Sequence, residues 1–192
     1  MKRLIETDRG GERGVHLSDC GAYRYRLWRA WDASRPTLAF LMLNPSTADH
    51  LVDDPTITRC LARAVANNFG RLEVLNLFPL RATDPDELLS HSAPLGRRKL
   101  ADGAILDAVD LASMVICAWG SHKAVGTRAS EVLHLLHNAR MSGKLFHLGL
   151  NLDGNPKHPL YIKAATQPVP LEFIARPGLD KEHLKSRAIR EV

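Results

Sequence analysis

The fold of this chain is decided by residues 37–43, which read Thr-Leu-Ala-Phe-Leu-Met-Leu. This short apolar run lies between Pro36 and the pair Asn44-Pro45. Its length and its boundaries are typical of a strand that is buried on both faces. Such strands occur in parallel sheets that helices cover on both sides. We therefore predict an α/β domain with a central strand at residues 37–43.

The sequence after this strand alternates between helix and strand patterns. Asp54 and Pro55 predict the N-cap and first turn of a helix that ends near Gly70, and residues 72–78 form a second apolar run. Strand, helix and strand in this order predict parallel pairing through a right-handed crossover. The pattern repeats with helices predicted over residues 95–112 and 122–140, the second capped by Ser121, and strands predicted over residues 114–119 and 145–150.

The two ends of the chain show other patterns. Residues 22–31 alternate aromatic or apolar side chains with arginines, which predicts an antiparallel edge strand with inward rings and outward charges. Residues 166–192 contain prolines and a basic end, so we expect loops that wrap the sheet before a short helix. The predicted fold is an α/β three-layer sandwich with a central four-stranded mainly parallel sheet and N-terminal antiparallel edge strands. We expect one domain over residues 1–192, with its core at about 22–165.

Composition places the chain among globular proteins. Hydrophobic residues make up 45% of the sequence and charged residues 24%, so the chain has enough apolar surface to fold without crosslinks. Its apolar runs are far shorter than the roughly 20 residues that cross a bilayer, and its start does not resemble a secretory signal. We expect a cytoplasmic protein without membrane association. The formal net charge of +5 permits nucleic acid as a partner.

Polar residues that can carry chemistry follow each predicted strand. The carboxyl ends of parallel strands meet at one edge of an open sheet, where ligands usually bind. We therefore expect Asn44, Asn76 and His158 to share one rim. The four loops are Asn44-Pro45-Ser46-Thr47-Ala48-Asp49, Asn76-Leu77-Phe78-Pro79, Gly120-Ser121-His122-Lys123 and Asn155-Pro156-Lys157-His158-Pro159-Leu160.

These segments resemble motifs of the uracil-DNA glycosylase superfamily, in the same order along residues 38–160. The apolar strand with Asn44 and Pro45 resembles the first motif, in which the asparagine positions the attacking water. Asn76 is similar to the second-strand asparagine that reads the base edge. Residues 116–122 resemble the third-strand segment. Residues 158–160, His-Pro-Leu, resemble a shortened last motif, which carries the catalytic histidine and a leucine that probes DNA.

The resemblance implies hydrolysis or recognition of the N-glycosidic bond of a nucleobase, in DNA or in a nucleotide, with neither an organic cofactor nor a metal. The implied catalytic residues are Asn44, which orients water, and His158, which stabilises the departing base. No aromatic residue occurs between Asn44 and Phe69, where these glycosylases place the ring that stacks on the base. The residues expected to bind substrate are Pro45, Ser46, Thr47, Asn76, Phe78, Ser121, His122, Lys123 and Leu160.

Other functions stay open at this point. Residues 43–49, Leu-Asn-Pro-Ser-Thr-Ala-Asp, with residues 54–56 and 81–83, also resemble an uncharacterised bacterial and phage domain family. A protein of the same fold without catalysis would act as a nucleic-acid or nucleotide binding module. The three acids of the loop at residues 49–54 would instead support a metal-assisted hydrolase.

Overall fold

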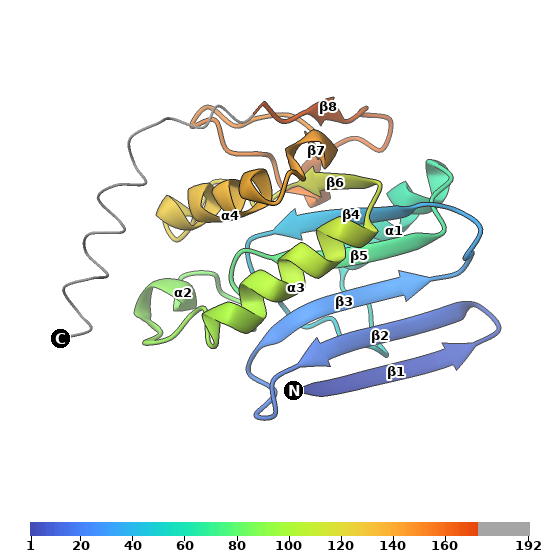
Figure 1. The fold of residues 1–192 in the computed structure, drawn as a ribbon, viewed down its shortest axis with the longest axis horizontal. Helices are drawn as coiled ribbons and strands as arrows, with labels where there is room; N and C mark the ends of the chain where they lie inside the picture. Colours follow the sequence, from blue (N-terminus) through green and yellow to red (C-terminus); the bar gives the residue numbers. More distant parts are fainter. Residues whose placement is uncertain (173–192) are drawn as a thin grey trace.

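A computed structural model describes residues 1–172 of the chain (Figure 1). Within this range one mixed sheet of eight strands has the order β1-β2-β3-β5-β4-β6-β7-β8. The strands are β1 (Lys2–Asp8), β2 (Gly11–Leu17), β3 (Arg24–Ala30), β4 (Thr37–Met42), β5 (Arg71–Asn76), β6 (Met114–Cys117), β7 (Leu145–His147) and β8 (Val169–Pro170). The helices are α1 (Pro55–Ala66), α2 (Glu87–Ser90), α3 (Arg98–Leu111) and α4 (Gly126–Asn138), with short 3-10 helices η1 (Ser142–Lys144) and η2 (Pro159–Tyr161).

The sheet differs from the predicted one. β4 pairs in parallel with β5 and β6, and β6 pairs in parallel with β7. However, β3 pairs antiparallel with β5 and so joins the β1–β2 hairpin to the same sheet, while β8 adds an antiparallel strand beyond β7. The prediction of a four-stranded mainly parallel sheet of the uracil-DNA glycosylase type is therefore wrong.

β1, the outer strand of the hairpin, escaped prediction because of its exposure. All seven residues of β1 are exposed, so the sequence shows no alternation between buried and solvent positions. β1 forms the edge of the sheet, and β3, which we predicted to be an edge strand, lies between β2 and β5. Burial of β3 between two strands changes the expectation for its arginines, as the site described below shows.

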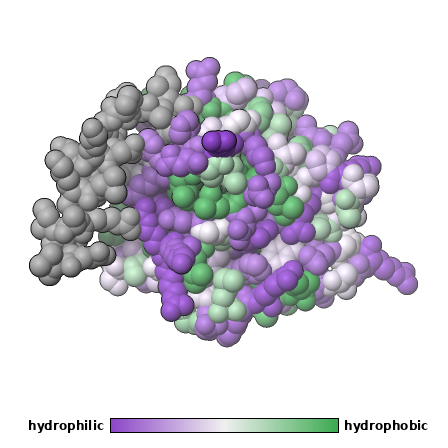
Figure 2. Space-filling model, in the orientation of Figure 1, coloured by the Kyte–Doolittle hydropathy of each residue, from purple (hydrophilic) through white to green (hydrophobic). Residues whose placement is uncertain are grey.

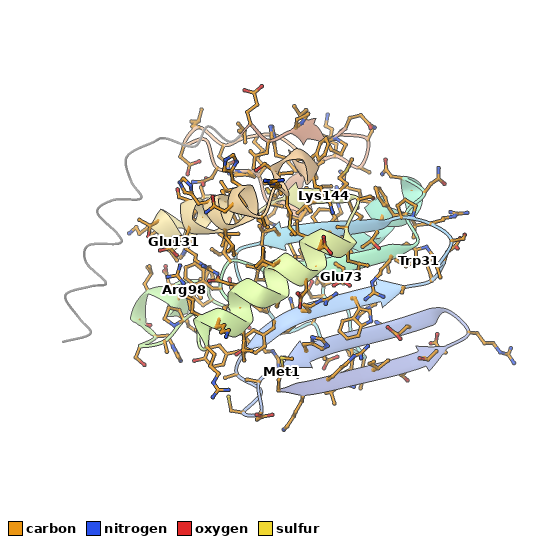
Figure 3. All side chains as sticks on the ribbon, in the orientation of Figure 1. Met1, Trp31, Glu73, Arg98, Glu131 and Lys144 are labelled. Carbon is orange, nitrogen blue, oxygen red and sulfur yellow. The ribbon has the colours of Figure 1, made fainter. Side chains whose placement is uncertain are left out.

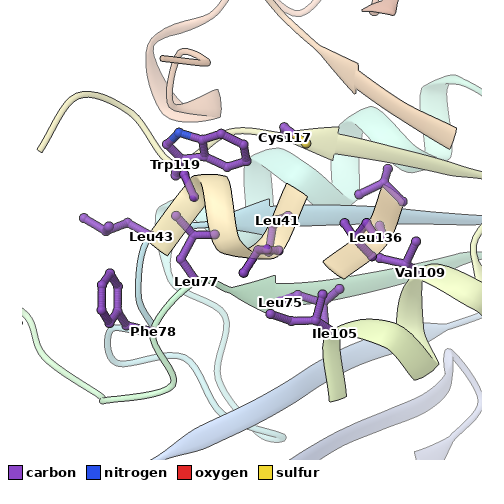
Figure 4. Close-up of a cluster of buried hydrophobic side chains, with 14 of the residues drawn as sticks. Leu41, Leu43, Leu75, Leu77, Phe78, Ile105, Val109, Cys117, Trp119 and Leu136 are labelled. Atoms are coloured by element: carbon purple, nitrogen blue, oxygen red, sulfur yellow. The ribbon is translucent and has the colours of Figure 1, made fainter. Parts of the chain in front are cut away.

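The two faces of the sheet carry separate apolar cores. α3 and α4 cover one face, where Leu41, Val109 and Leu136 belong to a single buried cluster (Figure 4). α1 covers the other face, where Phe40 and Ile57 are buried. Successive residues of β4 point to opposite faces, so both faces of this strand are covered and its sequence is apolar at every position after Thr37. Toward solvent, the α3–α4 side is largely hydrophilic, with hydrophobic side chains gathered near its centre (Figure 2).

The helix ends agree only in part with prediction. α1 begins as expected, because the Asp54 side chain accepts a hydrogen bond from the Ile57 backbone N–H at 2.8 Å. α4 begins later than predicted, with Val125 and not Ser121 as its N-cap. Among residues 1–172 no helix has both the length and the apolar character for a membrane span. The expected terminal helix lies outside the described residues.

A buried carboxylate joins β3 to β5. The side chain of Glu73 is fully buried (Figure 3), and its Oε1 lies 2.8 Å from an Arg26 nitrogen and 2.6 Å from an Arg71 nitrogen. Both arginines also lie near the ring of Trp28. Because a buried charge needs a partner, this network gives Arg26 and Arg71 a structural role.

Candidate active site

A cavity of about 200 Å³ lies at the carboxyl edge of the parallel strands. It is lined by the loops that follow β4, β5, β6 and β7, together with the start of β3 and the start of α1. Asn44, Ser46 and His158 line it, whereas Asn76, which was expected on the same rim as Asn44 and His158, does not. The full lining is Arg24, Met42, Leu43, Asn44, Ser46, Asp54, Thr56, Ile57, Ala82, Thr83, Pro85, Trp119 and His158.

Three predicted residues lie next to this cavity without lining it. Pro45 is buried, and its carbonyl accepts the backbone N–H of Ala82 at 3.0 Å. Thr47 is exposed. The Leu160 N–H donates to Nδ1 of His158 at 3.4 Å.

The remaining predicted residues lie farther from the cavity. Asn76 is buried, and its Oδ1 faces the guanidinium of Arg24 at 3.4 Å. Phe78 belongs to the apolar core under α3 and α4. Ser121 and Lys123 are exposed, and His122 places Nε2 3.1 Å from a carboxylate oxygen of Asp86. The structure therefore does not bring these five side chains into the cavity lining.

Asn44 is held with its amide nitrogen toward the protein. Its Nδ2 donates to the carbonyl of Ala82 at 2.8 Å and to the carbonyl of Pro45 at 3.0 Å. Its Oδ1 has no hydrogen bond to any part of residues 1–172. An amide with both donors engaged offers a ligand or a water its carbonyl oxygen. Asn44 is thus a fixed acceptor in the cavity wall.

His158 faces the cavity as a neutral donor. Its Nδ1 accepts the Leu160 N–H, and an imidazole with Nδ1 as acceptor carries its proton on Nε2. Burial lowers the pKa of His158 from its ordinary value of 6.5, with the negative charge of Asp54 acting in the opposite direction. At neutral pH the side chain is therefore uncharged, and Nε2–H is its free donor.

Two arginines of α1 fix the chain that follows His158. Arg59 donates to the carbonyl of Ile162 at 2.5 Å, and Arg63 donates to the carbonyls of Lys163 and Thr166 at 2.9 and 2.7 Å. Arg59 and Arg63 are four residues apart, which places them on one face of the helix. Sequence reasoning missed this role, since the spacing shows a shared face but not the partner.

Trp119 is an aromatic residue of the cavity lining. Trp119 (Figure 4) follows β6, it is 4% exposed, and its Nε1–H donates to Oδ1 of Asn155 at 3.0 Å. The N–H of Gly120 donates to the carbonyl of Pro156 at 2.8 Å, so the loops after β6 and β7 are joined beside the cavity. The Trp-Gly-Ser end of the third apolar run was a visible signal, but only the fold places the ring here.

Arg24 carries a buried charge without an ion-pair partner among the described residues. The side chain is 3% exposed, and it donates from Nη1 to the carbonyl of Ala48 at 2.8 Å and from Nη2 to Asn76. Its Nε is buried without a partner, and no carboxylate in the described chain forms an ion pair with it. Burial lowers the pKa of Arg24 to about 10, so the guanidinium stays charged at neutral pH.

A β-bulge turns Arg24 toward the cavity. The pairing of β2 with β3 shifts register between His16 and Leu17. Strict alternation would place positions 24 and 29 on opposite faces, yet Arg24 bonds to Ala48 and Arg29 bonds to Asp49 in the same loop. Bulges re-aim side chains in this way next to functional sites. The prediction that both arginines point outward into solvent is wrong.

The acids of the loop at residues 49–54 have separate partners. Asp49 accepts two backbone N–H bonds inside its own loop, Asp53 pairs with Arg13 and Arg29, and Asp54 caps α1. Over the part of the chain that the structure describes, no three His, Cys, Asp or Glu side chains are grouped to hold a metal ion. The three carboxylates of this loop are therefore each engaged separately within the protein.

Comparison with known proteins gives one match. Residues 24–160 match a family model described as "Protein of unknown function (DUF1643)". No curated protein and no solved structure matches the chain. The matched range begins with β3 and ends within η2, so it contains every residue that lines the cavity.

Proposed function

The chain belongs to the DUF1643 family, and we propose from the chemistry of its cavity that it binds a nucleobase and hydrolyses the N-glycosidic bond of that base. The base would belong to a nucleic acid or to a nucleotide. The observation that carries this proposal is the meeting of Asn44 and His158 in one cavity. The first presents a fixed acceptor and the second a neutral donor.

The two groups suit opposite ends of the reaction. Cleavage of this bond develops positive charge on the sugar and negative charge on the departing base. Oδ1 of Asn44 would accept a hydrogen bond from the attacking water, whose oxygen bonds to the sugar carbon as the bond to the base breaks. The electron pair leaves with the base, where Nε2–H of His158 would stabilise it. The water releases a proton and the base takes one up, so one water is consumed.

The size and lining of the cavity also support a nucleobase. Its volume of about 200 Å³ is below the roughly 300–1,000 Å³ of pockets for larger ligands, so it suits a ligand as small as one nucleobase, with one ring or two fused rings. Trp119 provides an aromatic surface, and Met42, Ile57 and Pro85 provide apolar contacts. Bases stack on such rings with little dependence on sequence. A base in a duplex would have to leave the helix to enter.

This chemistry is the one implied by the resemblance to uracil-DNA glycosylases, but the proposal rests on the cavity and not on the sheet. Asn76 was expected to read the base edge, but it is buried, it does not line the cavity, and its side chain contacts Arg24. In the proposed function, other residues therefore recognise the edge of the base.

The experiment is a search for released free base by mass spectrometry. Single-stranded and duplex DNA containing uracil or modified bases, and a panel of nucleotides, would be incubated with the wild type. We expect release, and we expect Asn44→Ala and His158→Ala to slow it by about 10²–10⁴-fold, the range for loss of a catalytic acid or base. His91→Ala is the matched control, because His91 also accepts the N–H of the second following residue but does not line the cavity.

This assay can disprove the proposed hydrolysis. If no substrate yields free base, or if both variants release it at the wild-type rate, the hydrolytic role of this cavity is wrong. Salt-dependent binding of nucleic acid without release would favour the alternative of a binding module.

A further inference from the structure

The cavity contains one cation and one anion, Arg24 and Asp54, which attract each other without forming a close ion pair. Arg24 and Asp54 both line it, and no ion pair joins them or ties either one to another residue in the described part of the chain. Asp54 uses one carboxylate oxygen to cap α1, and its second oxygen has no hydrogen bond within residues 1–172. Arg24 is buried and Asp54 is partly buried. An unpaired buried charge is costly, so a ligand that meets Arg24 and also bonds to the free oxygen of Asp54 would be stabilised by both groups.

These two charges define the kind of ligand. A simple oxoanion would be attracted by Arg24 and repelled by Asp54. A simple cation would be attracted by Asp54 and repelled by Arg24. A neutral ligand with acceptors on one side and donors on the adjacent side satisfies both groups. Nucleobases are neutral and have such edges.

The number of free donors narrows the choice of base. A guanidinium has five N–H donors, and Arg24 uses one N–H of Nη1 on Ala48 and one N–H of Nη2 on Asn76. Its Nε–H is buried, so one donor on each terminal nitrogen is left for a ligand. Arginine is the usual partner of the O6 and N7 acceptors of guanine, which its fork meets together. The adjacent N1–H and N2–H₂ of guanine match a carboxylate. Adenine places an N–H₂ donor where guanine has O6, so it would set a donor against a cation.

We propose that Arg24 and Asp54 make the cavity selective for guanine, with the O6 and N7 edge on Arg24 and the N1–H and N2–H₂ edge on Asp54. This selectivity rests on the proposed function, since it names the base that the same cavity takes. Binding and hydrolysis are separable, so the selectivity has a test of its own.

The test measures binding of 2′-fluoro-2′-deoxynucleosides, whose glycosidic bond resists hydrolysis, by isothermal titration calorimetry. We expect the guanine nucleoside to bind the wild type at least tenfold more tightly than the adenine, cytosine and uracil nucleosides. Arg24→Met and Asp54→Asn should each reduce guanine affinity at least tenfold. Asp54→Asn keeps a residue that caps helices well, so its fold is preserved.

Arg29→Lys is the matched control, because Arg29 contacts the same loop but already pairs with Asp53 and does not line the cavity. It should retain the wild-type preference. Equal affinity for all four bases, preference for another base, or no nucleoside binding would each overturn the selectivity. Guanine preference without base release would overturn only the hydrolysis, and base release without guanine preference would overturn only the selectivity.

Discussion

Arg24 and Arg29 belong to the same strand and contact the same loop, but their surroundings differ. Arg29 places a guanidinium nitrogen 2.5 Å from Asp53, whose other oxygen lies 3.1 Å from Arg13. Arg24 is equally buried and has only a carbonyl and an amide as partners. Burial lowers the pKa of both arginines, but only Arg29 has a hydrogen-bonded carboxylate that raises it again.

This difference separates a structural charge from one that is available to a ligand. The Arg29 region is complete within the protein, since each charge has a partner. The Arg24 region is incomplete, and it faces a cavity. Perturbed, unpaired groups in cavities are candidates for function, whereas paired networks are ordinary parts of a fold. The following predictions test this separation.

The largest expected effect is the loss of stability when Arg29 is removed from its ion pair with Asp53. Arg29→Met leaves Asp53 with Arg13 alone and should lower the free energy of unfolding by about 3 kcal/mol. Arg24→Met removes a buried charge that has no carboxylate partner, so its cost should be about 1 kcal/mol, from two lost hydrogen bonds. Urea denaturation of both variants measures the difference. Equal losses would show that the two arginines are energetically alike.

Glu73 with Arg26 and Arg71 is a second group in which each charge has a partner within the protein. Glu73→Gln keeps the shape of the side chain but removes the charge that Arg26 and Arg71 share. We expect a loss of about 2 kcal/mol, because hydrogen bonds to charged groups are replaced by weaker ones. The binding of nucleosides should not change, since Glu73 does not line the cavity. An altered base preference in this variant would contradict the separation.

Asp54 has both a structural contact and a position at the cavity, because it caps α1 and also lines the cavity. Asp54→Ala should lower the free energy of unfolding by about 1 kcal/mol through loss of the cap, and Asp54→Asn by a few tenths. Thermal unfolding followed by circular dichroism compares them. An equal loss in both would show that the negative charge, and not the cap, stabilises the fold.

The smallest expected effect is a dependence of stability on pH. The pKa of His158 is lowered in the folded protein, so the unfolded chain takes up a proton first as the pH falls below 6.5. The contribution of His158 to stability is therefore present at pH 7 and is lost as the pH falls through the folded pKa. His158→Gln should reduce the slope of stability against pH between 7 and 5. His91→Gln should keep the wild-type slope, and a reduced slope there would assign the effect to histidines in general.

Local patterns predicted the parts of this molecule that are determined locally. The apolar runs became β4, β5, β6 and β7, and the Asp54-Pro55 pair became the start of α1. Strand order was only partly accessible, because pairing of β3 with β5 joins distant segments and leaves no local signal. Asn44 and His158 both line the cavity, because parallel strands end at one edge of the sheet, but Asn76, which was expected with them, does not.

The amino-acid sequence by itself determined that buried strands alternate with helices, and that amides and an imidazole follow those strands. Only the tertiary structure decided which of these side chains face the cavity, and it added Trp119, Asp54 and Arg24. The physical reason lies in the range of the interactions. Hydrophobic periodicity and caps act within a few turns of chain, but the burial and the pairing of a charge depend on which distant segments the fold brings beside it.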